Sequence, residues 1–151
     1  MLHVCPLTRL HETVAATGAR HLVTLLDAAA PVARPPTVAE TDHLILRVND
    51  ITEPQDDLIC PEVSHIDALL DFVGRWAQSG PMVIHCFAGI SRSPATAFIA
   101  ACAIAPHRPE IQIASALRNA SRTATPNARL VALADERLGR NGRMIAAIQS
   151  I

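Results

Sequence analysis

Tyrosine is missing from the 151-residue sequence, and the other aromatic residues amount to three Phe and one Trp. The core must therefore be built from Leu, Ile, Val and Ala, a composition that suits short strands under alanine-rich helices. Half of the residues are apolar and 18% are charged, which excludes an intrinsically disordered chain. A chain of this length can bury the core of one domain, and we expect residues 1–151 to form it.

The sequence also lacks a large net charge, because it contains 13 basic and 14 acidic residues. Proteins that bind nucleic acids present a basic face, so we expect no nucleic-acid partner. The first ten residues lack the charged-then-apolar pattern of a signal peptide, and the longest apolar stretch, residues 95–105, is too short to cross a membrane. We therefore expect a cytoplasmic protein with no membrane partner.

Residue patterns that bind metals are absent as well. The cysteines are widely separated and contain no CxxC pair, which argues against a zinc site and a disulfide framework: Cys5, Cys60, Cys86 and Cys102. The histidines show no HxH or HExxH spacing. We expect no metal and no cofactor, and isolated thiols of this kind are typical of a reducing cytoplasm.

Strand and helix patterns alternate along the sequence. Buried-strand patterns predict strands at residues 2–7, 21–26, 43–48 and 82–85. Amphipathic or alanine-rich patterns predict helices at residues 8–17, 62–78, 93–105, 110–119 and 127–138. This alternation implies parallel pairing through right-handed crossovers. We predict the α/β class, with a central, mostly parallel sheet of four to five strands and helices on both faces.

The segment His85–Ser93 reads HCFAGISRS and follows a buried strand directly. Main-chain N–H groups in a tight loop before a helix attract an anion, and Gly89 allows the backbone angles of such a loop. Arg92 offers a planar, two-pronged contact to phosphate oxygens. The same positive field favours the thiolate form of Cys86, which makes its sulfur a nucleophile. The segment therefore predicts attack on a bound phosphate, a cysteinyl-phosphate and its later hydrolysis.

These nine residues resemble the signature of the cysteine-dependent protein tyrosine phosphatase superfamily, in particular a dual-specificity-like bacterial branch. The resemblance covers roughly residues 22–138 and implies the fold of these enzymes and a phosphate monoester hydrolase. It implies that Cys86 is the nucleophile and that Arg92 clamps the phosphate. Ser93 would assist the sulfur as it leaves, and His85 would brace the loop. The amides implied to hold the phosphate oxygens are those of Phe87, Ala88, Gly89, Ile90, Ser91 and Arg92.

The resemblance also implies a general acid, an aspartate on a loop upstream of the signature. Asp50 follows a predicted strand, and the triplet NDI around it is similar to the acid loop of dual-specificity enzymes. It lies further from the signature cysteine than is usual in the family, whereas Asp56 and Asp57 lie closer to the usual separation. Glu53 is a further carboxyl group on this segment. We predict Asp50 as the acid, with the other carboxyl groups as alternatives.

The variable positions of the signature carry no basic side chain: they are Phe87, Ala88, Ile90 and Ser91. Substrates with several phosphates need extra cations. We therefore predict one phosphate monoester, carried by a phosphorylated protein on tyrosine, serine or threonine, or by a small molecule. Two alternatives stay open, a rhodanese-like sulfurtransferase with the same Cys and Arg spacing and a binding module for phosphorylated residues. The sequence leaves the oligomeric state open.

Two features outside the signature bear on it. Asn127, in the sequence Thr125-Pro126-Asn127, is typical of a helix cap and is also a candidate to support the phosphate loop. Cys5 and Cys102 are interpreted as buried structural thiols, with a role as disulfide partners of an oxidised Cys86 as the alternative.

Overall fold

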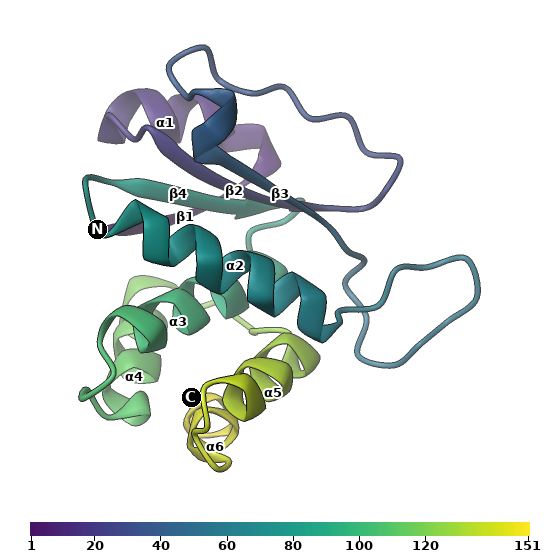
Figure 1. The fold of residues 1–151 in the computed structure, drawn as a ribbon, viewed down its shortest axis with the longest axis vertical. Helices are drawn as coiled ribbons and strands as arrows, with labels where there is room; N and C mark the ends of the chain where they lie inside the picture. Colours follow the sequence, from purple (N-terminus) through teal and green to yellow (C-terminus); the bar gives the residue numbers. More distant parts are fainter.

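The computed structural model describes residues 1–151 and shows a four-stranded sheet in which all neighbouring strands are parallel. Their spatial order is β1-β4-β2-β3 (Figure 1). The strands are β1 (Leu2–Pro6), β2 (His21–Leu26), β3 (His43–Arg47) and β4 (Met82–Cys86). The predicted α/β class is confirmed, and each strand forms where a buried-strand pattern occurs in the sequence.

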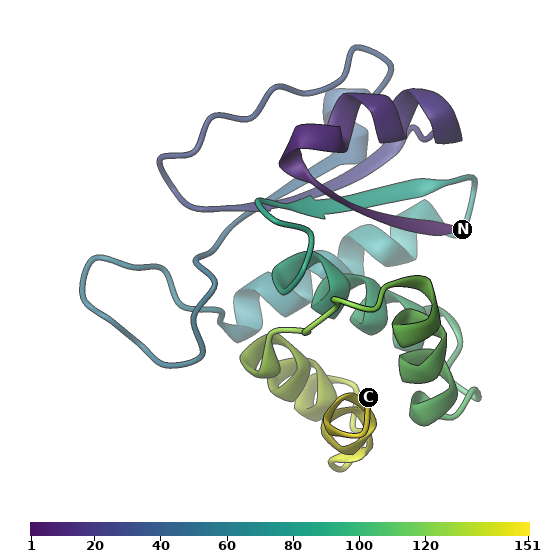
Figure 2. The same ribbon diagram turned by 180° about the vertical axis from the view of Figure 1, so that it is seen from behind.

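Helices cover both faces of the sheet, but unequally. They are α1 (Leu10–Thr17), α2 (Val63–Trp76), α3 (Arg92–Ile104), α4 (Glu110–Ala120), α5 (Ala128–Arg137) and α6 (Arg143–Gln149). α1 lies alone on one face, and α2 to α6 gather on the other (Figure 1, and from behind in Figure 2). Short 3₁₀ turns at Leu7–Arg9 and Glu40–Asp42 precede α1 and β3. No helix combines the length and the apolar character needed to cross a lipid bilayer.

The main core fills the space between the sheet and the larger group of helices. It contains 25 buried residues, whereas the cluster beneath α1 contains seven. The aromatic members of the main core are Trp76, Phe72 and Phe98, and aliphatic side chains supply most of the rest. β4 lies in the interior of the sheet and is buried along its whole length. Its last residue, Cys86, is paired with Pro6 of β1, and the residue before it, His85, is paired with both neighbouring strands.

Two boundaries at the signature differ from the prediction. β4 continues through Cys86, and α3 begins at Arg92, one residue earlier than expected. The irregular loop is therefore confined to residues 87–91, with His85 in the strand and Ser93 in the first helical turn. Pro94 is compatible with this early start because its fixed φ suits the first turn of a helix.

The predicted helices omit α6, which is a correction at the carboxyl end. α6 has only seven residues, and such a short element does not establish a helical period in the sequence. Its first turn is stabilised by a residue of the preceding helix. The carboxylate of Asp135 accepts hydrogen bonds from the amides of Gly142 at 2.6 Å and Met144 at 2.8 Å. α6 therefore depends on a tertiary contact with α5, which forms only when the turn between the two helices brings them together.

Candidate active site

Cys86 ends β4 at the carboxyl edge of the sheet, the edge at which open α/β sheets bind ligands. Only 2% of the residue is exposed. Its Sγ atom accepts a hydrogen bond from the Gly89 amide at 3.2 Å and lies 3.1 Å from the Ser93 hydroxyl. Donors in these positions stabilise negative charge on the sulfur.

The main-chain amides that follow this cysteine are unusual because most of them are unpaired. No group of the chain accepts a hydrogen bond from the amides of Phe87, Ala88, Ile90, Ser91 or Arg92. The loop also leads into α3, so the positive end of the helix dipole lies at the same place. Unpaired donors at the start of a helix form a binding site for an anion such as phosphate.

The back of the loop rests on the end of β1. Gly89 has a φ of 73°, and a Cβ atom added there would lie 2.8 Å from the Pro6 nitrogen. Only glycine fits such an approach in this conformation. The Leu7 amide also donates to the Phe87 carbonyl at 3.1 Å. The loop conformation therefore depends on the first strand as well as on its own sequence.

The Arg92 side chain is buried and reaches the ends of two neighbouring strands. Its Nη1 donates to Asp27 Oδ1 at 2.8 Å and to the Val48 carbonyl at 2.8 Å. Its Nε is buried and has no hydrogen-bond partner. A buried N–H group without a partner costs about 1–3 kcal/mol, which is why such groups are rare. This donor is therefore available to an oxygen atom of a ligand.

Asp50 is exposed and lies against the loop. Its Oδ1 accepts hydrogen bonds from the Ser91 hydroxyl at 2.7 Å and from Asn127 Nδ2 at 2.9 Å, whereas its Oδ2 has no donor within the chain. The alternative carboxyl groups are exposed on the segment 51–61, which projects from the body of the molecule (Figure 1). No hydrogen bond or ion pair joins them to the loop: Glu53, Asp56 and Asp57.

Asn127 contacts both a helix and the loop. Its Oδ1 accepts hydrogen bonds from the Arg129 and Leu130 amides at 3.1 and 3.0 Å, which caps α5. Its Nδ2 donates to Asp50, and its main-chain amide donates to the Ser91 carbonyl at 3.3 Å. One residue thus connects the start of α5, the exposed carboxylate and the signature loop.

His85 is fully buried in the central strand. Its Nε2 lies 2.7 Å from the Thr24 hydroxyl, which in turn lies 2.8 Å from His43 Nε2. A hydroxyl donates to one ring and accepts from the other, so the three side chains link β4, β2 and β3. Burial, with a smaller effect from the charge of His43, lowers the pKa of His85 to about 4. The ring is therefore neutral at neutral pH and holds the strand that carries Cys86.

Apolar side chains stand at the rim of the loop. Phe87 is 68% exposed and Ile90 is 41% exposed, values that are high for large apolar residues. On the other side, Asp50 and Ser91 border a groove of about 520 Å³. Its remaining walls are uncharged and mostly polar: Ile51, Thr52, Gln55, Thr125, Pro126, Asn127 and Ala128.

The sequence model of the protein-tyrosine phosphatase family matches residues 43–125. This match spans more than half of the chain and includes the whole signature. The chain belongs to this family. It is a cysteine-dependent phosphatase, as the signature predicts. No curated protein matches its sequence significantly.

Solved structures of dual-specificity and tyrosine phosphatases share the fold of this phosphatase. Human DUSP28 is 18% identical, with a TM-score of 0.64 over 93% of this chain and 92% of that chain. DUSP15 is 16% identical, with a TM-score of 0.71 over 99% and 88%. PTP-2 phosphatase of Cydia pomonella is 20% identical, with a TM-score of 0.69 over 89% and 84%. These likenesses concern the fold.

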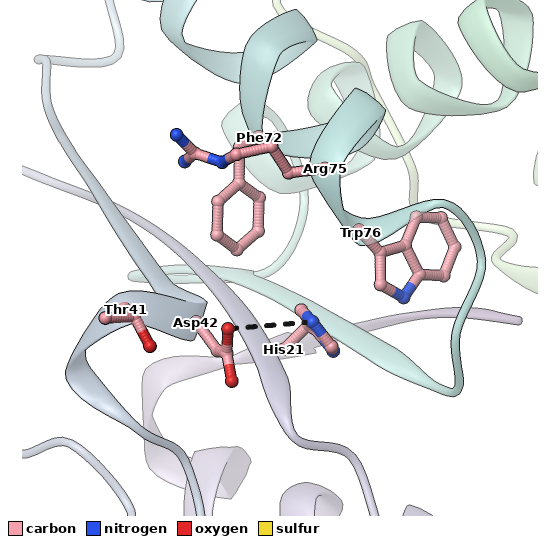
Figure 3. Close-up of a pocket in the computed structure, with 6 residues that line it drawn as sticks. All are labelled: His21, Thr41, Asp42, Phe72, Arg75 and Trp76. Atoms are coloured by element: carbon pink, nitrogen blue, oxygen red, sulfur yellow. Dashed lines mark ion pairs between the residues drawn. The ribbon is translucent and has the colours of Figure 1, made fainter.

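A second cavity of the phosphatase, of about 480 Å³, lies at the opposite edge of the sheet. His21, which begins β2, and Trp76, which ends α2, border it together with Asp42 (Figure 3). His21 Nε2 lies 3.8 Å from Asp42 Oδ1. None of the predicted site residues lines this cavity, and it faces the amino end of β2, so it is separate from the signature loop.

Three partners of the phosphatase site are missed by reasoning from the sequence: Thr24, Asp27 and His43. Asp27 directly follows β2, and parallel topology could have indicated it because the carboxyl ends of parallel strands share one edge. Thr24 is paired with His85 in the register of β2 and β4. That register depends on the strand order β1-β4-β2-β3, which cannot be predicted from any short segment of the sequence.

Proposed function

We propose that this phosphatase hydrolyses single phosphate monoesters through a cysteinyl-phosphate intermediate on Cys86. The observation that carries the proposal is the set of unpaired donors in the signature, namely the loop amides that follow Cys86 and the buried Nε of Arg92. Phosphate oxygens accept such donors, and a guanidinium group can contact two of them at once. A phosphate held by these groups would lie over the nucleophile.

The first chemical step transfers the phosphoryl group to the enzyme. The Cys86 sulfur forms a bond to phosphorus while the P–O bond of the ester breaks. Asp50 gives its proton to the departing oxygen. The contacts of Asp50 suit this role, because Ser91 and Asn127 hold Oδ1 and leave Oδ2 without a partner.

The second step returns the enzyme to its starting state. Water forms a bond to phosphorus, Asp50 accepts a proton from that water, and the S–P bond breaks. The products are inorganic phosphate and the Cys86 thiolate. Ser93, whose hydroxyl is 3.1 Å from the sulfur, stabilises this thiolate as it leaves.

The substrate class we propose is a protein phosphorylated on tyrosine, serine or threonine. The variable loop positions carry no cation for a second phosphate. Exposed Phe87 and Ile90 offer an apolar rim to a phenyl ring or to residues beside the phosphorylated one. The groove beside Asp50 offers hydroxyl and amide groups to the leaving group. Small phosphate monoesters that fit the same loop would also react.

We propose the cytoplasm as the place of action, because Cys86 acts only as a free thiol and all four cysteines are unpaired. We also predict that the phosphatase domain spans residues 1–151 and that the protein is bacterial.

Turnover of p-nitrophenyl phosphate tests the proposal. Cys86→Ser is expected to abolish it, and Asp50→Asn is expected to lower kcat by about 100-fold, within the usual contribution of a general acid. Asp57→Asn, on the projecting segment, is the matched control and should retain wild-type kcat. Full activity of Cys86→Ser would refute the proposal, and equal activity of the two Asn variants would refute the role of Asp50.

A substrate panel then separates the alternatives. Phosphotyrosine and phosphoserine peptides should be hydrolysed faster than inositol phosphates or nucleotides. Sulfur transfer from thiosulfate to cyanide, without phosphatase activity, would indicate a sulfurtransferase instead. Binding of phosphopeptides without release of phosphate would indicate a binding module.

A further inference from the structure

β1 forms an outer edge of the sheet, because β4 is its only neighbour in the order β1-β4-β2-β3 (Figure 2). In a parallel pair, the N–H and C=O groups of every second residue face the partner strand, and those of the residues between them face away. The Met1 carbonyl faces β4, since it accepts a hydrogen bond from the Met82 amide at 3.0 Å. The amides and carbonyls of Leu2 and Val4 therefore point away from β4, and no other strand pairs with them.

A cavity of about 890 Å³ lies along this free edge. Every residue from Met1 to Pro6 borders it, and α3 and α4 form much of its opposite wall. Most of its lining residues are hydrophobic, among them Phe98, Ile104, Ile113 and Leu117. Binding sites for ligands have comparable volumes, about 300–1,000 Å³, and similarly apolar linings. The free edge of β1 is thus the polar strip of an otherwise apolar cavity.

The outward groups of Leu2 and Val4 restrict what can occupy this cavity. Their amides and carbonyls need partners once a ligand displaces water, and each buried group without a partner costs about 1–3 kcal/mol. A lipid tail or another purely apolar ligand offers no donor or acceptor. An extended peptide offers both at the spacing of a strand, and it inserts every second side chain between β1 and the helices. The cavity therefore fits an added strand better than an apolar small molecule.

The charges at the cavity favour one kind of peptide. No Asp or Glu borders it, whereas His3 and Arg108 do. Arg108 is exposed, and Glu110, the acid nearest to it in the sequence, is paired with Arg140 and Arg143 instead. A second copy of β1 would bring the same basic groups to this place, so that like charges would meet. The charges therefore favour a peptide with acidic residues over a second copy of the chain.

We propose that the β1 edge and this cavity form a docking site for an extended segment of a partner protein, one with alternating apolar side chains and acidic residues at its ends. The segment pairs with the outward groups of Leu2 and Val4 and so extends the sheet, while its apolar side chains pack against α3 and α4. One acidic end lies near Arg108. The cavity also includes Gly89 and Ile90, so the bound segment reaches the signature loop. The inference is independent of the proposed function, because peptide binding requires no turnover.

Fluorescence anisotropy with labelled synthetic peptides tests the proposal. Probes of roughly seven residues span β1, which has five residues. Each probe alternates Thr with one apolar residue, Val, Leu or Phe through the series, and has Asp at both ends. The probe that binds most tightly is then N-methylated at one set of alternate residues or at the other. Because an added strand presents every second amide to the sheet, one set should raise Kd by about ten-fold or more and the other by less than about three-fold.

Two variants of the chain locate the site. Val4→Pro removes an outward N–H group but no hydrogen bond to β4, and it should raise Kd by about ten-fold. Arg108→Glu should raise Kd for the acidic probe by about five-fold at low salt. Arg20→Glu is the matched control, an equal change of charge at an exposed position outside the cavity, and should bind like wild type. Thermal midpoints check the fold of each variant, and the methylated pair of probes decides the question if Val4→Pro does not fold.

Several results would overturn the inference. One is the absence of binding by every probe at about 1 mM. Another is an equal effect of the two methylated sets, because apolar groups would then fill the cavity without strand pairing. Tighter binding of a probe with Lys at both ends would exclude an acidic partner, and a wild-type dimer that dissociates in Val4→Pro would assign the edge to a second copy. A protein that binds the probes as expected but hydrolyses no phosphate ester would contradict only the proposed function.

Discussion

Asn127 shows how one residue can contact both a helix and the proposed general acid, Asp50. Asp in its place keeps oxygen acceptors for the start of α5 but loses the donor to Asp50 and sets two carboxylates side by side. Asn127→Asp is therefore expected to keep the thermal midpoint within a few degrees while kcat falls by about ten-fold or more. Asn127→Ala should also lose about 1 kcal/mol of unfolding free energy with the cap. Wild-type kcat in Asn127→Asp would show that Asp50 needs no partner there.

The family could be predicted because the signature lies within nine consecutive positions. A cysteine, a glycine and an arginine at these spacings are typical of an anion-binding loop that leads into a helix. Asp27 and Thr24 could not be predicted in this way, because their contacts with Arg92 and His85 join elements that are far apart in the sequence. The choice among upstream carboxyl groups likewise depends on which of them the folded chain brings to Ser91, and only Asp50 makes this contact.

At the scale of elements, strands were easier to predict than the ends of helices. Buried strands carry continuous apolar runs, and all four appear where those runs occur. The helix expected at residues 8–17 begins instead with a 3₁₀ turn, and α6 was missed altogether. Both differences depend on contacts made elsewhere in the fold, such as that of Leu7 with Phe87 and those of Asp135 with the start of α6.

The dependence of α6 on α5 leads to a prediction for Asp135. Removing its buried carboxylate leaves the amides of Gly142 and Met144 without acceptors. Asp135→Ala is therefore expected to lower the unfolding free energy by about 2 kcal/mol, measured by urea denaturation. The exposed neighbour Glu136 provides the control, and Glu136→Ala should stay within about 0.5 kcal/mol of wild type. The active-site loop does not contact Asp135, so kcat should be preserved; an unchanged denaturation midpoint would contradict this account of α6.

For the whole molecule, the buried His85 predicts how stability depends on pH. Its pKa is about 4 in the fold and about 6.5 in the unfolded chain, so between these values the unfolded chain binds the extra proton. Unfolding free energy should therefore fall by about 3 kcal/mol as pH drops from 6.5 to 4, and that stability is fully present above pH 6.5. Burial also lowers the pKa of His43, which acts in the same direction.

Urea denaturation across this pH range checks the prediction. His85→Gln should show a much smaller decrease, whereas His11→Gln, at an exposed position of α1, should retain the full decrease. The quantity to compare is the slope of the unfolding free energy against pH, because His85→Gln also lowers the unfolding free energy at every pH. The same slope in both variants would assign the acid sensitivity to other groups.

The contact between the signature loop and the first strand predicts how proteolysis would affect the activity of the enzyme. Gly89 packs against Pro6, and the Leu7 amide holds the Phe87 carbonyl, so the loop has no support of its own on that side. A single cut near residue 8 that releases β1 would remove this support and leave Cys86, Arg92 and Asp50 covalently intact. Limited digestion would thus switch off turnover irreversibly, even though every reacting group remained in the chain.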